Sequence, residues 1–434
     1  MRDTDTIHAL ASGALPAGVA VVRVSGPLVP QLLNWIGQSL PPRRAVLATI
    51  RDGKGAPLDE VLAIHFPAPR SFTGEDVLEL HCHGGRAVVR AVSEQLTSLG
   101  SRPAEPGEFT MRAHASGRID LIEAERLADL IEAETEAQRR FAASDRGQRL
   151  STLYEGWREE LLHARALIEA SLDFADEEDA PSEVGPDVDA ILTRLRAAIA
   201  AHLATRHHRE IVARGLRVVI AGPPNAGKSS LLNALVKREA AIVTPIPGTT
   251  RDIVEAALEI GGHRIVLLDT AGLREANDPV EAIGVARARA RIADADAVLW
   301  LDPSDANASD DMPGEVLAHP NVLRLASRSD LAKAARPHDL AISTVAGTGM
   351  SALTAMLAGL AARAAPPPGV ETTMNERHER HLSRTLTHLE GATGPAERVA
   401  EEVRLATMEL GRITGATGIE DVYGAIFSRF CMGK

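Results

Sequence analysis

The segment GPPNAGKSS, residues 222–230, has the residue types and the spacing of a loop that binds phosphate. Its pattern, G-x-x-x-x-G-K-S, follows an apolar stretch and precedes SSLLNALV, so we expect a strand before the loop and a helix after it. Glycines let backbone N–H groups face phosphate oxygens. A chance glycine-rich turn would not need that context. We therefore expect Lys228 to contact the β- and γ-phosphates of a nucleotide and to assist catalysis, and Ser229 to bind Mg²⁺. The residues expected to line this loop are Asn225, Ala226, Gly227, Lys228, Ser229 and Ser230.

Two downstream segments carry residues that could complete a nucleotide site. PIPGTTRD, residues 245–252, is a candidate switch loop in which Thr250 would be a second Mg²⁺ ligand. DTAG, residues 269–272, follows an apolar stretch, so we expect an acidic group near the metal and a glycine amide near the γ-phosphate. Between them, DIVEAALEI-GG-HRIVLLDT predicts two strands joined by a hairpin. The nucleotide contacts expected from these segments are Thr244, Thr249, Thr250, Asp269, Thr270, Ala271 and Gly272.

The segment SRSD, residues 327–330, stands where a loop that reads the base would follow the next strands. The Asp330 carboxylate can accept two N–H bonds from guanine, a donor pair that adenine lacks. Together these segments resemble the Ras-like GTPase superfamily, in which the usual motif is Asn-Lys-x-Asp. Here Ser327 replaces Asn and Arg328 replaces Lys, although the Arg328 stem can still cover the base face. Ser343 begins a second loop that would contact the base. We expect guanine to be preferred but held less tightly.

These motifs do not identify the residue that orients the attacking water. Leu273 follows the DTAG glycine, where Ras-type enzymes place Gln, and an apolar side chain cannot orient water. Glu275 and Glu281 are local candidates, although both could be solvated acids at a helix start.

The positive charge that would stabilise the transition state also has two candidate sources. One is an arginine, either Arg251 or Arg274. The other is a monovalent cation such as K⁺, with Asn225 and switch-loop carbonyls as ligands.

The order of apolar patterns predicts a chain with α/β and all-α parts. Residues 1–118 mix apolar and alternating stretches typical of strands with helical segments. Residues 119–209 follow helical periodicity, residues 210–366 alternate strands and helices, and residues 367–434 are helical again after a proline-rich linker. Because neither helical half looks large enough to bury a good core alone, we expect the α/β module to be inserted into one helical domain.

Composition limits the classes of partner and compartment. The net charge is −12 and aromatic residues make up 3% of the chain, so a general nucleic-acid surface is not expected, although a local basic patch could still meet RNA. The two cysteines, Cys82 and Cys431, cannot form a disulfide framework or a four-cysteine zinc site. No apolar run approaches the length of a membrane span or a signal-peptide core. We expect a cytoplasmic protein with no membrane contact.

The segments that flank the nucleotide motifs resemble one family. They are PRSFTGEDVLELHCHGG (69–85), RPAEPGEFTMRAHASGRIDLIEAERLADLIEAET (102–135), DTAGLREANDPVEAIG (269–284) and the terminal FCMGK. With GPPNAGKSSLLNAL (222–235) and REAAIVTPIPGTTRD (238–252), they resemble the MnmE/TrmE family of bacterial tRNA-modifying GTPases over nearly the whole chain.

The resemblance implies a fold and an activity. It implies an N-terminal α+β folate-binding-like domain that dimerises (1–118), a helical domain from two segments (119–209 and 367–434) and an inserted Ras-like G domain (210–366). The activity is K⁺-stimulated GTP hydrolysis activated by G-domain dimerisation. With an MnmG/GidA-type partner that uses FAD and NADH, such a homodimer adds an aminomethyl or carboxymethylaminomethyl group at C5 of the tRNA wobble uridine. The one-carbon unit comes from 5,10-methylene-tetrahydrofolate, and 5-formyl-tetrahydrofolate is a related ligand.

The resemblance also assigns roles to individual residues. Glu281 matches the acid that orients water, and Ser229 and Thr250 match Mg²⁺ ligands. The matching K⁺ ligands are Asn225, Thr244, Ile246 and Thr249, the last three through backbone carbonyls. The matching folate contacts are Arg23, Glu79, Arg118 and Lys434, with Arg118 standing where Lys is usual.

The residues themselves support part of the folate assignment. In the strand DVLELHC, residues 76–82, Leu78, Leu80 and Cys82 share one face and Glu79 lies on the other, so Glu79 is free to bind a ligand. Arg23 sits inside an apolar strand, where an unpaired charge is costly, and an ordinary buried ion pair is the alternative explanation.

The terminal Cys431 has two interpretations. CMGK does not fit a prenylation box because Gly433 is not aliphatic and Lys434 is not a usual last residue. By resemblance Cys431 is a candidate nucleophile or activating residue at a second active site. A docked tail in which the thiol only packs is the alternative.

Two other classes of GTPase fit this sequence less well. A ribosome-assembly GTPase acting as an RNA-binding timer would be expected to carry a C-terminal GXXG module, and no such pattern follows residue 365. A membrane-remodelling GTPase would need an amphipathic insertion surface, and none is evident.

Overall fold

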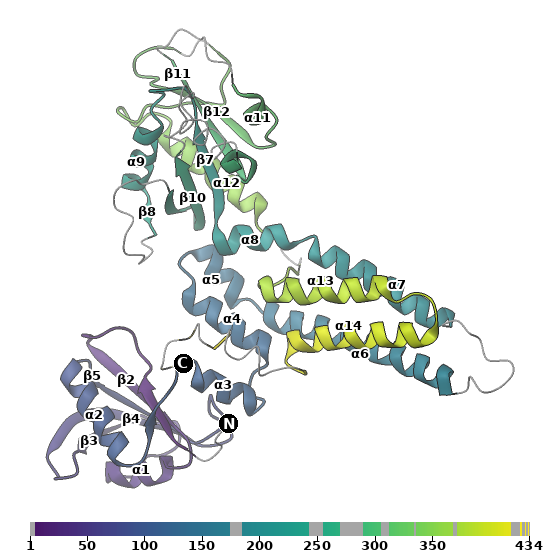
Figure 1. Ribbon diagram of the computed structural model, residues 1–434. Helices are drawn as coiled ribbons and strands as arrows, with labels where there is room; N and C mark the ends of the chain where they lie inside the picture. Colours follow the sequence, from purple (N-terminus) through teal and green to yellow (C-terminus); the bar gives the residue numbers. More distant parts are fainter. Residues whose placement is uncertain are drawn as a thin grey trace, which may run out of the picture. The chain divides into compact units, whose positions relative to one another are not determined.

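The structure is a computed structural model of the 434-residue chain (Figure 1). It describes residues 5–173, 185–242, 255–269, 290–304, 312–333, 336–367, 371–417, 426–427, 430 and 433. The chain forms two compact units. The first contains Met1–Ala128, Gly147–Arg196 and His381–Lys434, and the second contains Asp129–Arg146 and Ala197–Arg380.

The first unit contains a six-stranded sheet with the strand order β3-β4-β5-β2-β1-β6. β1 and β6 pair in parallel, and the other neighbouring strands pair antiparallel. The strands are β1 (Ile7–Leu10), β2 (Val19–Ser25), β3 (Val46–Arg51), β4 (Pro57–Phe66), β5 (Val77–His83) and β6 (Arg102–Pro103).

Two helices, α1 (Val29–Ile36) and α2 (Arg86–Ser98), pack on one face of this sheet. Leu78, Leu80 and Cys82 of β5 are buried against them, while Glu79 and His81 point to the opposite face and are half-buried. The alternation predicted for β5 is therefore confirmed. Each fully buried aliphatic side chain contributes about 1.5–3 kcal/mol to folding, which fixes the register of the strand.

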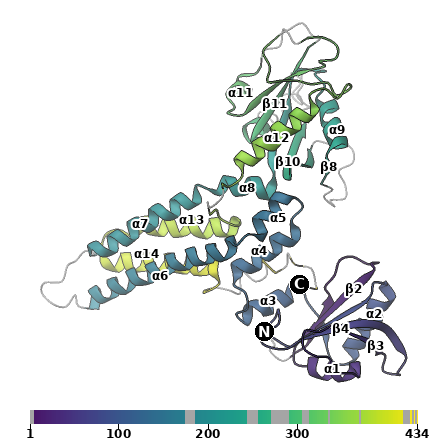
Figure 2. The ribbon, with the colours of Figure 1, turned by 180° about the vertical axis from the view of Figure 1, so that it is seen from behind.

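Helices from two distant parts of the sequence form a bundle, most of which belongs to the first unit. α6 (Arg146–Asp173), α7 (Pro186–Leu203), α13 (Glu376–Gly391) and α14 (Ala396–Thr414) lie side by side in both ribbon views (Figures 1 and 2). The His381 and Glu409 side chains, 2.6 Å apart, connect α13 to α14. Arg196 of α7 donates to the Leu389 carbonyl of α13. The helices before the bundle are α3 (Glu108–Ala115) and α4 (Leu121–Glu132).

The second unit contains a seven-stranded sheet with the order β13-β12-β11-β7-β10-β9-β8. The strands from β13 to β10 run parallel to one another, and β9 and β8 are antiparallel additions at one edge. They are β7 (Leu216–Ala221), β8 (Ala240–Ala241), β9 (Glu255–Ile260), β10 (His263–Asp269), β11 (Ala297–Pro303), β12 (Val322–Ser327) and β13 (Leu340–Ala341).

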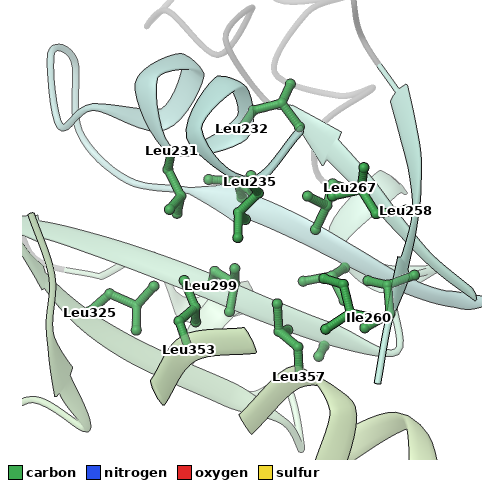
Figure 3. Close-up of a cluster of buried hydrophobic side chains, with 14 of the residues drawn as sticks. Leu231, Leu232, Leu235, Leu258, Ile260, Leu267, Leu299, Leu325, Leu353 and Leu357 are labelled. Carbon is green, nitrogen blue, oxygen red and sulfur yellow. The ribbon is translucent and has the colours of Figure 1, made fainter. Parts of the chain in front are cut away.

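Apolar side chains cover both faces of this sheet. On one face, leucines of α9 (Lys228–Arg238) and α12 (Met350–Ala364) meet leucines and isoleucines of the central strands (Figure 3). On the other, Val219, Val266 and Val298 pack with Val316 of α11 (Gly314–Leu317). The multidomain fold expected from the sequence, with α+β, helical and inserted P-loop parts, is confirmed.

A short segment from before the bundle packs on the seven-stranded sheet of the second unit. α5 (Glu136–Ala143) begins at Thr135 with a capping box, and the Ala137 amide donates to the carbonyl of Gly262 at 2.9 Å. Gln138 donates to the Ala213 carbonyl of α8 (Arg206–Arg214). Gly262 lies in the predicted β9–β10 hairpin, where Gly261 and Gly262 both have positive φ. The hairpin is therefore hydrogen-bonded to a segment more than 110 residues earlier in the chain.

A network of buried and half-buried charges fixes α3 to the edge of the N-terminal sheet. The Arg112 guanidinium donates to Asp5, Glu75 and Glu108 at distances of 2.7, 3.1 and 3.0 Å, respectively. Burial alone would raise the pKa values of Asp5 and Glu108, but hydrogen bonds from Arg102 and Arg112 outweigh it and hold both pKa values below their usual range. The carboxylates thus stabilise the fold above their unfolded-state pKa values, and this stabilisation is lost as the pH falls through their folded-state pKa values.

Replacing Arg112 with Met should destabilise the N-terminal domain by about 1.5–3 kcal/mol, because three carboxylates lose a buried donor and two of them keep only Arg102. The matched control is Arg90→Met, which removes an exposed arginine 4.0 Å from Glu94 and should change stability by less than about 1 kcal/mol. Hydrogen exchange of peptides from residues 5–118 in a urea series measures both values. Equal effects of the two substitutions would contradict a structural role for the network.

In the ranges that the structure describes, every helix is too short or too polar to cross a membrane.

Candidate functional site

The phosphate-binding segment lies between β7 and α9, as its sequence predicts. Gly222 has a φ of +149°, and a Cβ there would lie 2.6 Å from the carbonyl oxygen of Leu301 in β11, so no side chain fits. Gly227, directly before α9, has a φ of +95°. Asn225 adopts a φ of 61°, a conformation that few non-glycine residues take. The loop is thus held in a shape that its two glycines permit.

Lys228 reaches back over this loop. Its ammonium donates to the carbonyl oxygens of Gly222 and Pro223, both at 2.9 Å. Ser229 and Ser230 are exposed in the first turn of α9, whose N-terminal amides carry partial positive charge. A cation, exposed hydroxyls and a helix N-terminus therefore meet at one place, which is the chemistry that a polyphosphate chain requires.

Strand pairing brings the other nucleotide motifs to the same edge of the sheet. Asp269, the last residue of β10, pairs with Ile220 of β7, one residue from the end of that strand. Ser327, the last residue of β12, pairs with Pro303 of β11. Because parallel strands end at one edge, Asp269 and the segment 327–330 are placed beside the loop 222–227.

The segment SRSD is hydrogen-bonded to the phosphate-binding loop. The buried Ser327 hydroxyl donates to the Ala226 carbonyl at 2.8 Å, and the Arg328 guanidinium donates to the Asn225 carbonyl. Asp330 is exposed. Ser343 is buried, and its hydroxyl accepts a hydrogen bond from the Ala346 amide.

Ten of the predicted site residues lie outside the described residues. They are Thr244, Ile246, Thr249, Thr250, Thr270, Ala271, Gly272, Glu281, Cys431 and Lys434.

The predicted folate residues Arg23 and Glu79 meet in the N-terminal domain. They pair across β2 and β5, and the Arg23 Nε and Nη2 atoms lie 3.0 and 2.9 Å from Glu79 Oε1. Their side chains are 22% and 17% exposed, so the pair is reachable from solvent. The Arg23 guanidinium lies 5.6 Å from the centre of the Phe72 ring and 5.8 Å from that of Phe109.

This pair has the chemistry that a pterin ring needs. A carboxylate can accept adjacent N–H groups of a planar heterocycle, and a guanidinium beside aromatic rings offers a flat, weakly hydrated surface. Arg118 follows α3, is exposed and has its side chain beside Gly74. The residues present therefore fit a folate.

Sequence reasoning missed a pocket of about 720 Å³ in the same domain. Asp5, Thr73, Arg102, Arg112 and Ser116 are among its lining residues, and they come from separate segments of the chain. Only the i,i+4 pair Glu108–Arg112 gave a local signal in the sequence.

Cys82 is not a reactive group. Burial, with a smaller effect of Asp59, raises the pKa of its thiol to about 12, so the thiolate is scarce at neutral pH.

Comparison with known proteins identifies the family. The family model described as GTP-binding protein TrmE N-terminus matches residues 6–118, and that of the MnmE helical domain matches residues 121–431. The chain is 48% identical to the tRNA modification GTPase MnmE of Mesorhizobium japonicum and 46% identical to that of Rhizobium meliloti, with 100% of each chain covered. The chain belongs to the MnmE family. The resemblance inferred from the sequence is confirmed, and an MnmE-family chain is a GTPase.

Solved structures similar to this MnmE-family chain include G domains. The G domain of the T. maritima FeoB iron transporter is 26% identical to this chain. The match covers 34% of this chain and 98% of the FeoB chain, with a TM-score of 0.25. Aquifex aeolicus Era bound to GDP and AlF₄⁻ is 21% identical to this chain. The match covers 41% of this chain and 67% of the Era chain, with a TM-score of 0.26.

Proposed function

We propose that this chain is a cytoplasmic tRNA-modifying enzyme that couples GTP hydrolysis to the addition of an aminomethyl or carboxymethylaminomethyl group at C5 of the wobble uridine. The observation that carries the proposal is that one MnmE-family chain contains two preformed clusters of binding residues. One is the loop 222–227 with Lys228, and the other is the Arg23–Glu79 pair. In this proposal residues 1–118 bind folate and dimerise, 210–366 form the G domain, and 119–209 and 367–434 form the helical domain.

In this proposal each residue of the nucleotide site has a separate role in binding or hydrolysis. Lys228 holds the phosphates, Asp330 accepts the guanine N–H groups, and Glu281 orients the attacking water. Ser229 and Thr250 bind Mg²⁺, which neutralises phosphate charge. Asn225 and the carbonyls of residues 244, 246 and 249 bind K⁺, which places positive charge near the transition state.

The folate site would use Arg23, Glu79, Arg118 and Lys434 to hold a tetrahydrofolate derivative that supplies the one-carbon unit. The position of Gly433 supports this assignment. A Cβ at Gly433 would lie 2.0 Å from the carbonyl oxygen of Leu10, and Leu10 and Ala9 of β1 pair with Val22 and Arg23 of β2. Gly433 thus lies against the strand that pairs with β2 at Arg23, which supports a role for the C-terminal segment at the folate site.

An apolar row on the open face of the N-terminal sheet supports homodimerisation. Leu47 and Leu62 pair across β3 and β4 and are 58% and 44% exposed, and Leu62 pairs with His81 of β5. Val19 of β2 is also exposed. Exposed aliphatic residues that adjoin across strands are typical of a protein interface. The MnmG/GidA-type partner that uses FAD and NADH would act with this dimer.

GTP hydrolysis by the purified chain should be fast in K⁺ buffer and slow in Na⁺ buffer, with G domains pairing only in K⁺. Glu281→Ala should abolish hydrolysis and leave nucleotide binding unchanged. Phosphate-release kinetics and fluorescent-GDP titration measure the two properties. Equal rates in the two buffers would remove the K⁺ assignment, and loss of GDP binding in Glu281→Ala would show a structural role.

A strain that lacks this gene should lose C5 modification of wobble uridines, measured by mass spectrometry of tRNA. The wild-type gene and the control Glu94→Gln, an exposed carboxylate on α2, should restore it, while Glu79→Gln should restore less than about a tenth. Unchanged modification in the deletion strain would refute the proposed function. Full restoration by Glu79→Gln would refute the folate site alone.

A further inference from the structure

Two proline-rich turns meet at one corner of the N-terminal sheet, where β3 begins and β4 ends. In PPRR, residues 41–44, the amide of the last residue donates to the carbonyl of the first at 3.2 Å. In PAPR, residues 67–70, the same hydrogen bond has a length of 3.1 Å. Because each proline fixes its own φ, both turns have little freedom to rearrange.

Arg43 connects the two turns. Its amide donates to the His65 carbonyl at 2.8 Å, and its guanidinium donates to the Arg70 carbonyl. The same guanidinium lies 5.9 Å from the centre of the Phe66 ring. A cationic group that is already held by a carbonyl and an aromatic ring loses little conformational entropy when it binds a ligand.

The positive charge of this corner is not neutralised by neighbouring acids. Its three arginines are exposed, and none of them forms an ion pair within the ranges that the structure describes: Arg43, Arg44 and Arg70. Asp76 is hydrogen-bonded to the second turn through the Ala68 amide at 3.2 Å, and the same carboxylate oxygen lies 3.1 Å from His65 Nε2. The carboxylate is thus directed at His65 and not at a guanidinium.

The rest of the chain makes this corner unusual. The net charge of the chain is −12, so most of its surface repels a polyanion. A planar guanidinium can donate two parallel hydrogen bonds to one phosphate, and arginine is the usual residue where phosphates are recognised. Three such groups on stiff turns therefore fit the phosphate backbone of an RNA.

The corner adjoins the folate pair on the open face of the sheet. Ile64 of β4 pairs with Glu79 of β5, and Phe66 follows Ile64 by two residues, so it is on the same face. Two residues of a strand span about 7 Å. An RNA that contacts the Arg43 guanidinium above Phe66 would therefore lie close to the Arg23–Glu79 pair.

We propose that Arg43, Arg44 and Arg70 form a docking surface for the phosphate backbone of the tRNA substrate, and we name this surface the arginine corner. The inference rests on the proposed function for the identity of the RNA, and it adds the surface that holds it. Each arginine neutralises phosphate charge and releases counterions, so it contributes affinity that falls as salt rises. These contacts position the RNA and do not read its sequence.

Replacing all three arginines with Gln should weaken tRNA binding about hundredfold in about 100 mM salt. It should also reduce the slope of log affinity against log salt by about 2–3, because up to three phosphate contacts are lost. Fluorescence-anisotropy titration of the full chain with an unmodified tRNA transcript, over a salt series, measures both quantities.

The matched control removes three positive charges from other parts of the same domain. It combines Arg51→Gln, Lys54→Gln and Arg90→Gln. Arg51 pairs with Pro57 at the opposite end of the β3–β4 ladder, Lys54 lies in the turn between these strands, and Arg90 is on α2. This variant should keep tRNA affinity within about threefold and leave the salt slope unchanged. Equal losses in the two triple variants would show an effect of net charge alone and would overturn the proposal.

A double variant covers the case in which the triple variant does not fold. Arg44→Gln with Arg70→Gln keeps the contact of the Arg43 guanidinium with the carbonyl of residue 70, and it should still weaken tRNA binding at least about tenfold. Binding of 5-formyl-tetrahydrofolate should stay unchanged in this variant, which shows that the N-terminal sheet is intact.

Two further results would contradict the arginine corner. One is a wild-type chain that does not bind the transcript. The other is a triple variant that binds tRNA like the wild type but no longer binds the MnmG/GidA-type partner in co-sedimentation, which would make this corner a protein interface. Neither result depends on the modification assay of the deletion strain, so failure of this inference is distinguishable from failure of the proposed function.

Discussion

The parallel pairing of β7 with β10 and β11 is the constraint on which the nucleotide site depends. Together with the parallel pairing of β11 and β12, it brings the ends of β7, β10 and β12 to one edge of the sheet, where the loop 222–227, Asp269 and the segment 327–330 lie. The pairing is stable because both faces of these strands are buried, with leucine clusters on one side and valines on the other. A polar residue in the centre of β7 would therefore disturb every motif at once.

In the N-terminal sheet, antiparallel strands bury apolar side chains on one face and present charged side chains on the other. Alternation places Leu78 and Leu80 in the core and leaves Glu79 on the open face, where Arg23 neutralises it. The ion pair is half-buried and remains accessible, so a ligand can compete for it. The exposed Leu47 and Leu62 lie on the same face as Glu79. Ligand binding and dimerisation are thus proposed for one surface.

Local patterns in the sequence were sufficient for much of this fold. The glycine spacing at 222–227, the Gly261–Gly262 hairpin and the alternation of β5 each depend on neighbours within a few residues, and each was predicted. The docking of α5 on Gly262, the Arg112 network and the contact of Ser327 with Ala226 were not. Each joins segments far apart in the chain, and hydrogen bonds of that kind leave no periodic signal. Ser327 stands out in the sequence only as a departure from a motif.

The central claim is that one chain carries two separate ligand sites. Equilibrium dialysis of the full chain with GDP and 5-formyl-tetrahydrofolate, in wild type, Lys228→Ala and Arg23→Ala, tests it most directly. We expect one equivalent of each ligand for the wild type, loss of GDP alone in Lys228→Ala and loss of the folate alone in Arg23→Ala. Loss of both ligands in either variant, or no folate binding by the wild type, would contradict it.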